Sequence, residues 1–150
     1  MKQAQKIIDL YLQSLEGFKK LEATPRDFGT GDLLYSSEIH TLQMVSRHAG
    51  LNLTELSDKL GVSKSASSKF VRKLIDKKLI TKDRVAGNKK EVVFFVTEKG
   101  RTAALGHEAF AGETLGAIHQ LIEACTEKES ALLERFLSQL VAEVKKINQS

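Results

Sequence analysis

The chain has 150 residues, of which 41% are hydrophobic, and a formal net charge of +4; this is enough chain for one domain with a core. Its basic residues are concentrated in one region. Residues 54–101 hold 13 Lys and Arg against 6 Asp and Glu, whereas the rest of the chain holds 10 against 13. A local excess of this kind is expected of a surface that binds nucleic acid.

Three features of the sequence indicate the cytoplasm. The chain does not open with the apolar core of a signal peptide. It contains no apolar run that approaches the roughly 18 residues of a membrane-spanning helix. The single cysteine, Cys125, excludes an internal disulfide and fits a reducing compartment. We therefore expect a cytoplasmic protein with no membrane partner.

The first stretch, residues 3–22, is expected to form a helix. Ile8, Tyr11, Leu15 and Phe18 recur at spacings of 3, 4 and 3 residues, and further apolar residues widen this stripe. So much apolar surface on one N-terminal helix requires burial on two sides or against a partner subunit.

A loop is expected next, over residues 23–31, because it holds the only proline and two glycines. Ser36 or Ser37 then caps a helix that runs through Ala49 and ends at Gly50. Three apolar residues of this helix are expected to face inward: Ile39, Leu42 and Val45.

Residues 53–80 have the pattern of two helices joined by a tight turn. Thr54 is a suitable N-cap for the first helix, and Gly61 can adopt the left-handed conformation that ends it. Ser63 is an N-cap for a second helix, which is expected over about 64–78. Two helices joined by a short turn that contains glycine are typical of a helix-turn-helix, whose second helix reads DNA.

The second helix of this pair has two distinct faces. One face is apolar and is expected to pack inward: Ala66, Phe70, Val71, Leu74 and Ile75. The other face carries hydroxyls and cations that suit bases and phosphates: Ser65, Ser68, Lys69 and Arg72, with Lys64 and Lys73 at its margins. An ordinary solvated helix face is the alternative, but the turn, the caps and the strands that follow favour DNA binding.

The periodicity changes after this pair. Residues 79–84 and the β-branched and aromatic stretch 92–96 are expected to form strands, with a basic turn over 85–90 between them. A hairpin directly after a helix-turn-helix is a wing. Thr97 then caps a long helix that continues to about Ala124 and contains three glycines, at which the helix can bend or pack closely.

The last helix is expected from Glu127 to about Ile147, because Thr126 and Glu129 form a capping box. Its apolar residues step by 4, 3, 4 and 3, which gives a narrow seam suited to association with another helix. Together with the N-terminal stripe this seam defines a candidate dimer interface. Its members are Ile8, Tyr11, Leu15, Leu133, Leu137, Leu140, Val144 and Ile147.

The stretches LTELSDKLGVSKSASSKFVRKLIDKKLI and VTEKG, with long helices at both ends of the chain, resemble the MarR family of winged helix-turn-helix transcriptional regulators. The resemblance covers nearly the whole chain. It implies a mainly α-helical single domain, 1–150, with a small β-wing. A winged helix-turn-helix lobe, about 36–97, would be flanked by N- and C-terminal dimerisation helices, about 1–22 and 98–148.

The resemblance also implies function. It predicts a homodimeric repressor that binds a palindromic operator in double-stranded DNA and is released by a small-molecule effector. The second helix would enter the major groove and the wing would approach the minor groove. The expected DNA-binding residues are Ser63, Lys64, Ser65, Ser68, Lys69, Arg72, Lys73, Arg84, Asn88, Lys89 and Lys90.

An effector would bind between the dimer helices and the DNA-binding lobe. Candidate lining residues are Phe18, Tyr35, His40 and Met44. Core packing is the alternative role for Phe18 and Met44, and capping or loop anchoring is the alternative for Tyr35.

The wing departs from the family pattern. Where relatives carry Asp-x-Arg, this chain has Asn88 and Lys90, which do not reproduce the charge-assisted bond that orients the arginine. Asp83 and Arg84 lie earlier, at the base of the wing, and are the candidate substitutes.

No catalytic signature is present: the chain lacks H-E-x-x-H, C-x-x-C, a phosphate-binding loop and a complete G-x-G-x-x-G. Its four histidines are scattered along the sequence, so we predict no enzyme activity, no cofactor and no metal site. Cys125 is interpreted as a small buried residue, with a redox switch as the alternative. A dimeric effector-sensing or protein-interaction module that no longer reads DNA remains the alternative function.

Overall fold

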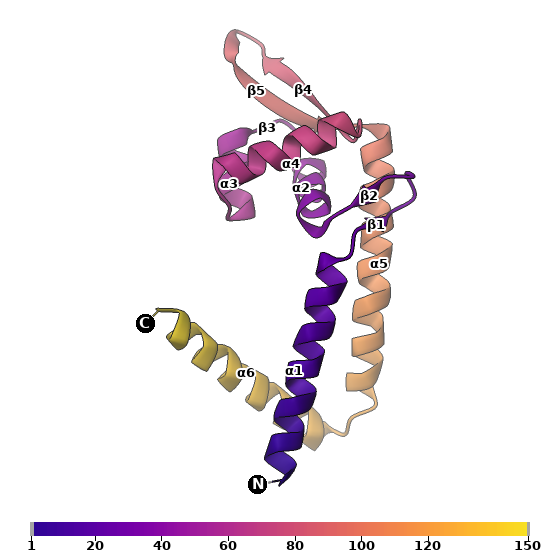
Figure 1. Cartoon of the computed structure of the whole chain (residues 1–150), viewed down its shortest axis with the longest axis vertical. Helices are drawn as coiled ribbons and strands as arrows, with labels where there is room; N and C mark the ends of the chain where they lie inside the picture. The colour runs from indigo at the N-terminus through magenta and orange to yellow at the C-terminus, as the bar shows by residue number, and fades with distance from the viewer. Residues whose placement is uncertain (1, 150) are drawn as a thin grey trace. The chain divides into compact units, whose positions relative to one another are not determined.

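The computed structural model describes residues 2–149, and Figure 1 shows its elements in chain order. The order is α1 Lys2–Ala23, β1 Arg26–Asp27, β2 Leu33–Leu34, α2 Ser36–Arg47, β3 Leu51–Asn52, α3 Leu53–Leu60, α4 Lys64–Asp76, β4 Ile80–Val85, β5 Asn88–Val96, α5 Glu98–Glu123 and α6 Glu127–Gln149. The chain divides into two compact units, 1–108 and 109–150, with the division inside α5. None of the helices described is both long and apolar enough to cross a membrane.

The mainly helical fold with a small β-wing is confirmed, and the expected helices form within a few residues of their predicted bounds. Two predicted caps are wrong. The N-cap of α3 is Asn52 rather than Thr54, because the Asn52 side chain accepts from the backbone N–H of Glu55 at 2.9 Å. The N-cap of α2 is Tyr35, since the Glu38 carboxylate accepts the Tyr35 N–H at 2.9 Å; the predicted Ser36 and Ser37 cap positions are the first two helical residues.

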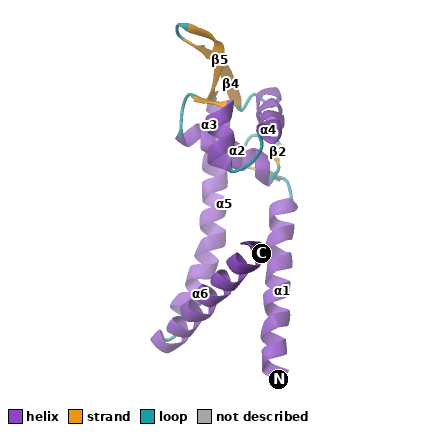
Figure 2. Cartoon of the chain, turned by 90° about the vertical axis from the view of Figure 1, so that its left-hand side faces the viewer, coloured by secondary structure: helices purple, strands orange, loops and turns teal. Residues whose placement is uncertain are grey.

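A three-stranded antiparallel sheet carries the wing, in the strand order β3-β5-β4. Strands β4 and β5 form a hairpin in which Ile80 lies opposite Val96 and Arg84 lies opposite Val92 (Figure 2). Strand β3 was not predicted. It is only two residues long, Leu51–Asn52, and it forms because β5 provides an edge for it to pair with.

The segment expected to be a loop, 23–31, contains β1, which pairs with β2 in a second, two-stranded sheet. Asp27 holds the turn between these strands, because one of its carboxylate oxygens accepts the backbone N–H groups of Gly29, Thr30 and Gly31 at 2.8 to 3.0 Å. These hydrogen bonds, those of Thr30 and Gly31 foremost, lower the pKa of Asp27.

The core of the first unit lies among α2, α3, α4, the start of α5 and the wing sheet. The inward residues predicted for α2 are all buried, as are residues from each neighbouring element: Leu34, Ile39, Leu42, Val45, Leu56, Leu74, Leu79, Ile80 and Ala103. Gly100 and Gly106 allow α5 to approach other backbone segments closely, because a Cβ at these positions would collide with the carbonyls of Leu79 and Phe28 respectively. The predicted close packing is thus found at Gly106, but not at Gly112 or Gly116.

Helices α1 and α6 bury none of their described residues. Each instead exposes a row of large apolar side chains. In α1 this row includes Ile7, Ile8, Leu12, Leu15 and Phe18, and in α6 it includes Leu133, Phe136, Leu137, Val144 and Ile147. An exposed apolar row of this length is expected only where another surface covers it.

Candidate nucleic-acid interface

The helix-turn-helix is formed by α3, a short turn and α4. Gly61 ends α3 in the predicted left-handed conformation, with φ of 66°. Ser63 caps α4, as predicted, because its hydroxyl oxygen accepts the Ala66 N–H at 3.1 Å. The sequence-predicted turn is therefore confirmed residue by residue, and it fixes the start of α4.

One face of α4 anchors it to the core. Val71 and Leu74 are buried, and Ala66, Phe70 and Ile75 are half-buried, as predicted for the apolar face. Ser67, which was not assigned to the apolar face, is fully buried. A serine here is small enough to let α4 lie close to the elements beneath it, and its polarity hid it from the apolar pattern.

The opposite face of α4 is accessible. Lys64, Ser65, Lys69, Arg72 and Lys73 are exposed, and Ser68 is half-buried. The Lys73 ammonium lies 5.7 Å from the centre of the Tyr35 ring, in a cation–π contact. The remaining cations project from the helix as a contiguous basic face of the kind that donates hydrogen bonds to phosphates and guanine edges.

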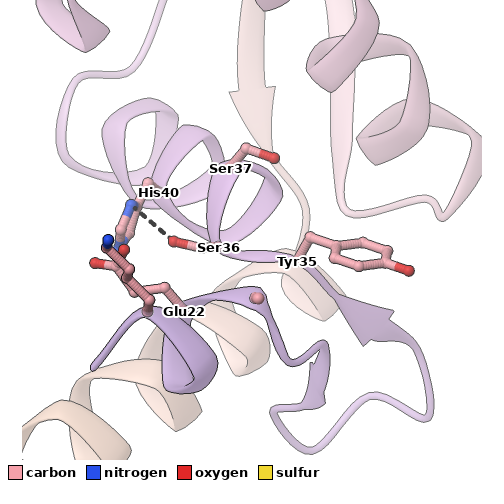
Figure 3. A pocket seen from close by; sticks show the side chains of 7 residues that line it. Glu22, Tyr35, Ser36, Ser37 and His40 are labelled. Atoms are coloured by element: carbon pink, nitrogen blue, oxygen red, sulfur yellow. Dashed lines mark hydrogen bonds between the residues drawn. The ribbon is translucent and has the colours of Figure 1, made fainter. Parts of the chain in front are cut away.

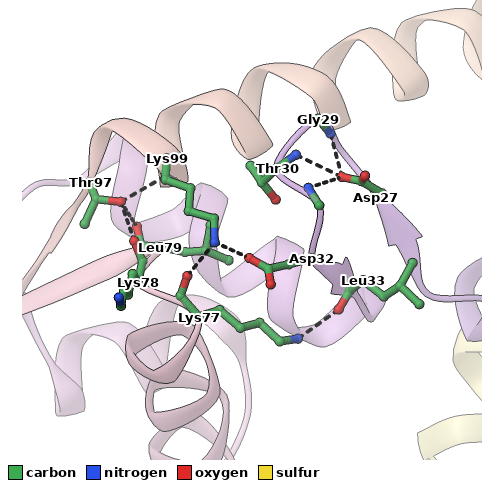
Figure 4. A network of polar contacts seen from close by, with 12 residues as sticks. Asp27, Gly29, Thr30, Asp32, Leu33, Lys77, Lys78, Leu79, Thr97 and Lys99 are labelled. Atoms are coloured by element: carbon green, nitrogen blue, oxygen red, sulfur yellow. Dashed lines mark hydrogen bonds and ion pairs between the residues drawn. The ribbon is translucent and has the colours of Figure 1, made fainter.

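The C-terminal end of α4 is fastened by two lysines (Figure 4). The Lys77 ammonium donates to the Leu33 carbonyl and to a Glu38 carboxylate oxygen, both at 2.8 Å. The Lys99 ammonium lies 2.6 Å from the Asp32 carboxylate and donates to the Lys77 carbonyl at 3.1 Å. These contacts join the end of α4 to α2, to the β1–β2 turn and to the start of α5.

The wing turn is tighter than predicted. Strand β5 already begins at Asn88, so the turn between the strands consists of Ala86 and Gly87, with Gly87 at a φ of 84°. Arg84, Asn88 and Lys90 are exposed on this hairpin. The side chain of Lys89 lies outside the described residues.

The two polar pairs of the wing differ in what they bind. Asp83 accepts the backbone N–H of Arg84 at 2.7 Å. The Asn88 side-chain oxygen accepts the Lys90 N–H at 3.2 Å, and its amide nitrogen donates to Glu91 at 3.3 Å. The carboxylate in this part of the wing is therefore Glu91, which sequence reasoning did not single out because it follows the Asn88-x-Lys90 positions.

A hollow of about 500 Å³ opens between the end of α1 and the start of α2 (Figure 3). Its lining residues are Lys19, Glu22, Ala23, Tyr35, Ser36, Ser37 and His40. Two of the four predicted effector residues, Tyr35 and His40, are among them, whereas Phe18 and Met44 are not. The Tyr35 ring points away from Ser36, His40 and Glu22.

His40, which lines this hollow, contacts a second histidine, His107. The rings of His40 and His107 are T-shaped at 5.6 Å, and His107 also packs against Phe28 at 5.2 Å. Burial lowers the pKa of His107, and the nearby His40 and Arg47 lower it further while Glu108 opposes them. Within residues 2–149, no group of three or more His, Cys, Asp or Glu side chains could hold a metal ion.

Cys125 lies in the turn after α5 and is half-buried, not buried as predicted; its thiol donates to the Leu121 carbonyl at 3.5 Å. The predicted dimer residues of α1 and α6 are exposed or half-buried. Leu15 and Tyr11 are among the more covered in α1, and Leu140 among those in α6.

The helix-turn-helix, its exposed basic face and the hairpin that follows define a winged helix-turn-helix protein. The family model described as "MarR family" matches residues 34–92, which are the part of the chain that contains these elements. Residues 34–92 therefore carry a winged helix-turn-helix of the MarR type, and the curated relatives of the chain are transcriptional regulators.

Two curated relatives illustrate this. The HTH-type transcriptional regulator PchR of Bacillus subtilis (strain 168) is 29% identical over 106 residues, which are 71% of this chain and 63% of PchR. The transcriptional regulator ZitR of Lactococcus lactis subsp. cremoris (strain MG1363) is 28% identical over 110 residues, which are 73% of this chain and 75% of ZitR. The matched region thus spans less than two thirds of PchR.

Solved structures agree on the fold. The crystal structure of ZitR, described as a zinc-responsive MarR family member, superposes with a TM-score of 0.77 at 23% identity, covering 94% of this chain and 99% of ZitR. A ZitR mutant in complex with DNA superposes with a TM-score of 0.74 at 25% identity, covering 93% and 97% of the two chains.

Proposed function

We propose that this protein is a homodimeric transcriptional repressor that binds a palindromic operator in double-stranded DNA. The observation that carries the proposal is the exposed basic face of α4, presented by a capped helix-turn-helix and followed by a wing. The DNA complex of the related ZitR supports the same reading. A protein that regulates transcription in this way acts in the cytoplasm, beside the chromosome.

The dimer is supported by the apolar rows of α1 and α6, which the single chain leaves exposed. A second copy of the chain covers such rows by symmetry, because the same surface on each subunit is complementary to itself. Two copies of α4 related by a two-fold axis would read two half-sites about 34 Å apart, and the operator would therefore be a palindrome.

Within each half-site the roles divide by position. Arg72, at the centre of the exposed face of α4, donates to a base edge in the major groove. The hydroxyls and lysines around it, Ser63, Lys64, Ser65, Ser68, Lys69 and Lys73, contact the backbone or neighbouring bases. The wing approaches the minor groove and contacts the DNA there through Arg84, Asn88, Lys89 and Lys90.

Release by a small effector is the regulatory part of the proposal. The hollow lined by Lys19, Glu22, Ser36 and His40 lies between α1 and the DNA-binding elements. A ligand that binds there lowers DNA affinity only by as much as it prefers a subunit spacing that does not fit the operator. Replacing His40 and Ser36 together with Ala should abolish the ligand response and leave operator affinity intact; an unchanged response would rule out this hollow.

Selection of random double-stranded DNA by the purified protein tests the proposal. The expected result is a palindrome with half-sites about one helical turn apart. The matched control is Arg72→Ala, which should lose the enrichment at one position in each half-site. A native protein that enriches no sequence would support the alternative, a dimeric sensing module that does not read DNA.

A further inference from the structure

A hydrogen-bonded bridge connects the wing to the start of α3. The Glu91 carboxylate accepts from the Asn52 side-chain amide through one oxygen, at 2.9 Å, and from the Asn88 side-chain amide through the other, at 3.3 Å. Asn52 is the N-cap of α3, and Asn88 is the first residue of β5 after the wing turn. We call the three side chains the Glu91 bridge.

The amides at both ends of the bridge are fixed by their other atoms. The Asn52 oxygen accepts the Glu55 N–H at 2.9 Å, so its nitrogen must face Glu91. The Asn88 oxygen accepts the Lys90 N–H at 3.2 Å, so its nitrogen also faces Glu91. Each amide therefore uses its donor and its acceptor at once, and neither can rotate without breaking a bond.

The bridge runs from the helix-turn-helix to the backbone of Lys90. Strand β3 leads directly into α3 and forms only two residue pairs with β5, Leu51 with Phe94 and Asn52 with Val93. The rest of the hairpin projects beyond these pairs (Figure 2). A carboxylate that accepts two hydrogen bonds is the strongest polar link available at this point, because the bonds are charge-assisted.

We propose that Glu91 is a positioning residue that sets the angle of the wing and thereby the contact of Lys90 with DNA. This proposal rests on the proposed DNA-binding function. It assigns to the bridge the orienting role that an Asp-x-Arg pair has in the family pattern, with the link made to α3 instead of within the wing.

The sign of the effect makes the proposal testable. Removing a negative charge from a DNA-binding surface should tighten binding if electrostatics alone decides. Glu91→Ala should instead weaken operator binding by at least roughly tenfold, because both charge-assisted hydrogen bonds of the bridge are lost in each subunit. Asp83→Ala is the matched control, because Asp83 lies on the same hairpin, carries the same charge and is exposed outside the bridge. Asp83 accepts the backbone N–H of Arg84 and not its guanidinium, so it does not take the orienting role considered for it from the sequence. The Asp83→Ala variant should leave affinity unchanged or raise it.

Glu91→Gln guards against a folding defect in the alanine variant. The glutamine keeps an oxygen for Asn52 but presents a second donor to Asn88, so we expect a loss of about threefold. Combining Glu91→Ala with Lys90→Ala should cost no more than Glu91→Ala alone, since Lys90 is already displaced. Tighter binding by either Glu91 variant, or additive losses in the double variant, would overturn the proposal.

A measurement without DNA separates the two proposals. Amide hydrogen exchange at Lys90 in the free protein should accelerate in Glu91→Ala and not in Asp83→Ala. Unchanged exchange would overturn the bridge whatever the protein binds. Faster exchange in a native protein that selects no DNA sequence would keep the bridge and remove the proposed function.

Discussion

The ammonium group of Lys77 lies 2.8 Å from a carboxylate oxygen of Glu38, whose side chain is only 1% exposed. The same carboxylate accepts the Tyr35 N–H through its other oxygen, and the same ammonium donates to the Leu33 carbonyl. One ion pair therefore joins the N-terminal end of α2 to β2 and to the C-terminal end of α4. The recognition helix is fixed at both ends, by Ser63 and by Lys77.

Breaking this pair should be costly. Lys77→Met leaves the Glu38 carboxylate buried without its cation, for which we expect a loss of about 3 kcal/mol in the free energy of unfolding. Urea denaturation at a fixed protein concentration measures the loss. The control is Arg101→Met, which removes the exposed pair with Glu98 and should change stability by less than about 0.5 kcal/mol. Equal effects of the two variants would contradict a structural role for the buried pair.

The sequence alone predicted the parts of the fold that local chemistry decides. Gly61 and Ser63 were identified correctly because a left-handed residue and a helix cap act on their immediate neighbours. The two-residue strands β1, β2 and β3 were missed because they are too short to show an alternating pattern. Strand β3 in addition exists only through its pairing with the distant strand β5. The cap of α3 was predicted at Thr54, two residues late, because the pairing of Asn52 with Val93 on β5 that places the true cap is also long-range.

The candidate site was predictable to a similar extent. Periodicity separated the basic face of α4 from its buried face, but it did not reveal Ser67 as buried or Glu91 as the carboxylate of the wing. Glu38 and Lys77 are 39 residues apart, and nothing local in the sequence pairs them. Long-range polar contacts of this kind depend on the tertiary fold and leave no periodic signal.

The C-terminal helix provides the test of the dimer. Placing Asp at both Leu137 and Leu140 introduces charge into the exposed apolar row of α6, and the expected result is loss of the dimer together with unfolding of the subunit. Placing Asp at Ala131 and Ala142, which are exposed on the opposite side of the helix, adds the same charge and should preserve both. Sedimentation measures the mass. A folded native monomer at every concentration would refute the dimer.

The histidine pair predicts a dependence of stability on pH. Burial lowers the pKa of His107 below its ordinary value of 6.5, so the unfolded chain binds a proton at a higher pH than the folded chain does. The stabilisation is therefore complete above pH 6.5 and is lost as the pH falls toward the folded pKa. The melting temperature should differ less between about pH 7.5 and about pH 5.5 in His107→Gln than in the native protein. An equally large difference in the variant would show that other groups cause the pH dependence.

The last prediction separates the recognition helix from the wing. Arg72→Ala removes the proposed base contact, which should cost about 1–3 kcal/mol and relax base preference at one position in each half-site. Lys90→Ala removes a charge near phosphate, so all sequences should weaken alike. Because the dimer carries the substitution twice, the salt dependence of the logarithm of affinity should flatten by roughly 2.

Binding of both variants to a panel of single-base operator variants, at several salt concentrations, measures these effects. Arg72→Ala should change the preferred sequence, whereas Lys90→Ala should leave it unchanged, since a point charge on a wing turn carries no base-specific hydrogen bond. An altered base preference in Lys90→Ala, with uniform weakening in Arg72→Ala, would reverse the two roles. Native affinity in both variants would exclude α4 and the wing as the DNA-binding surface.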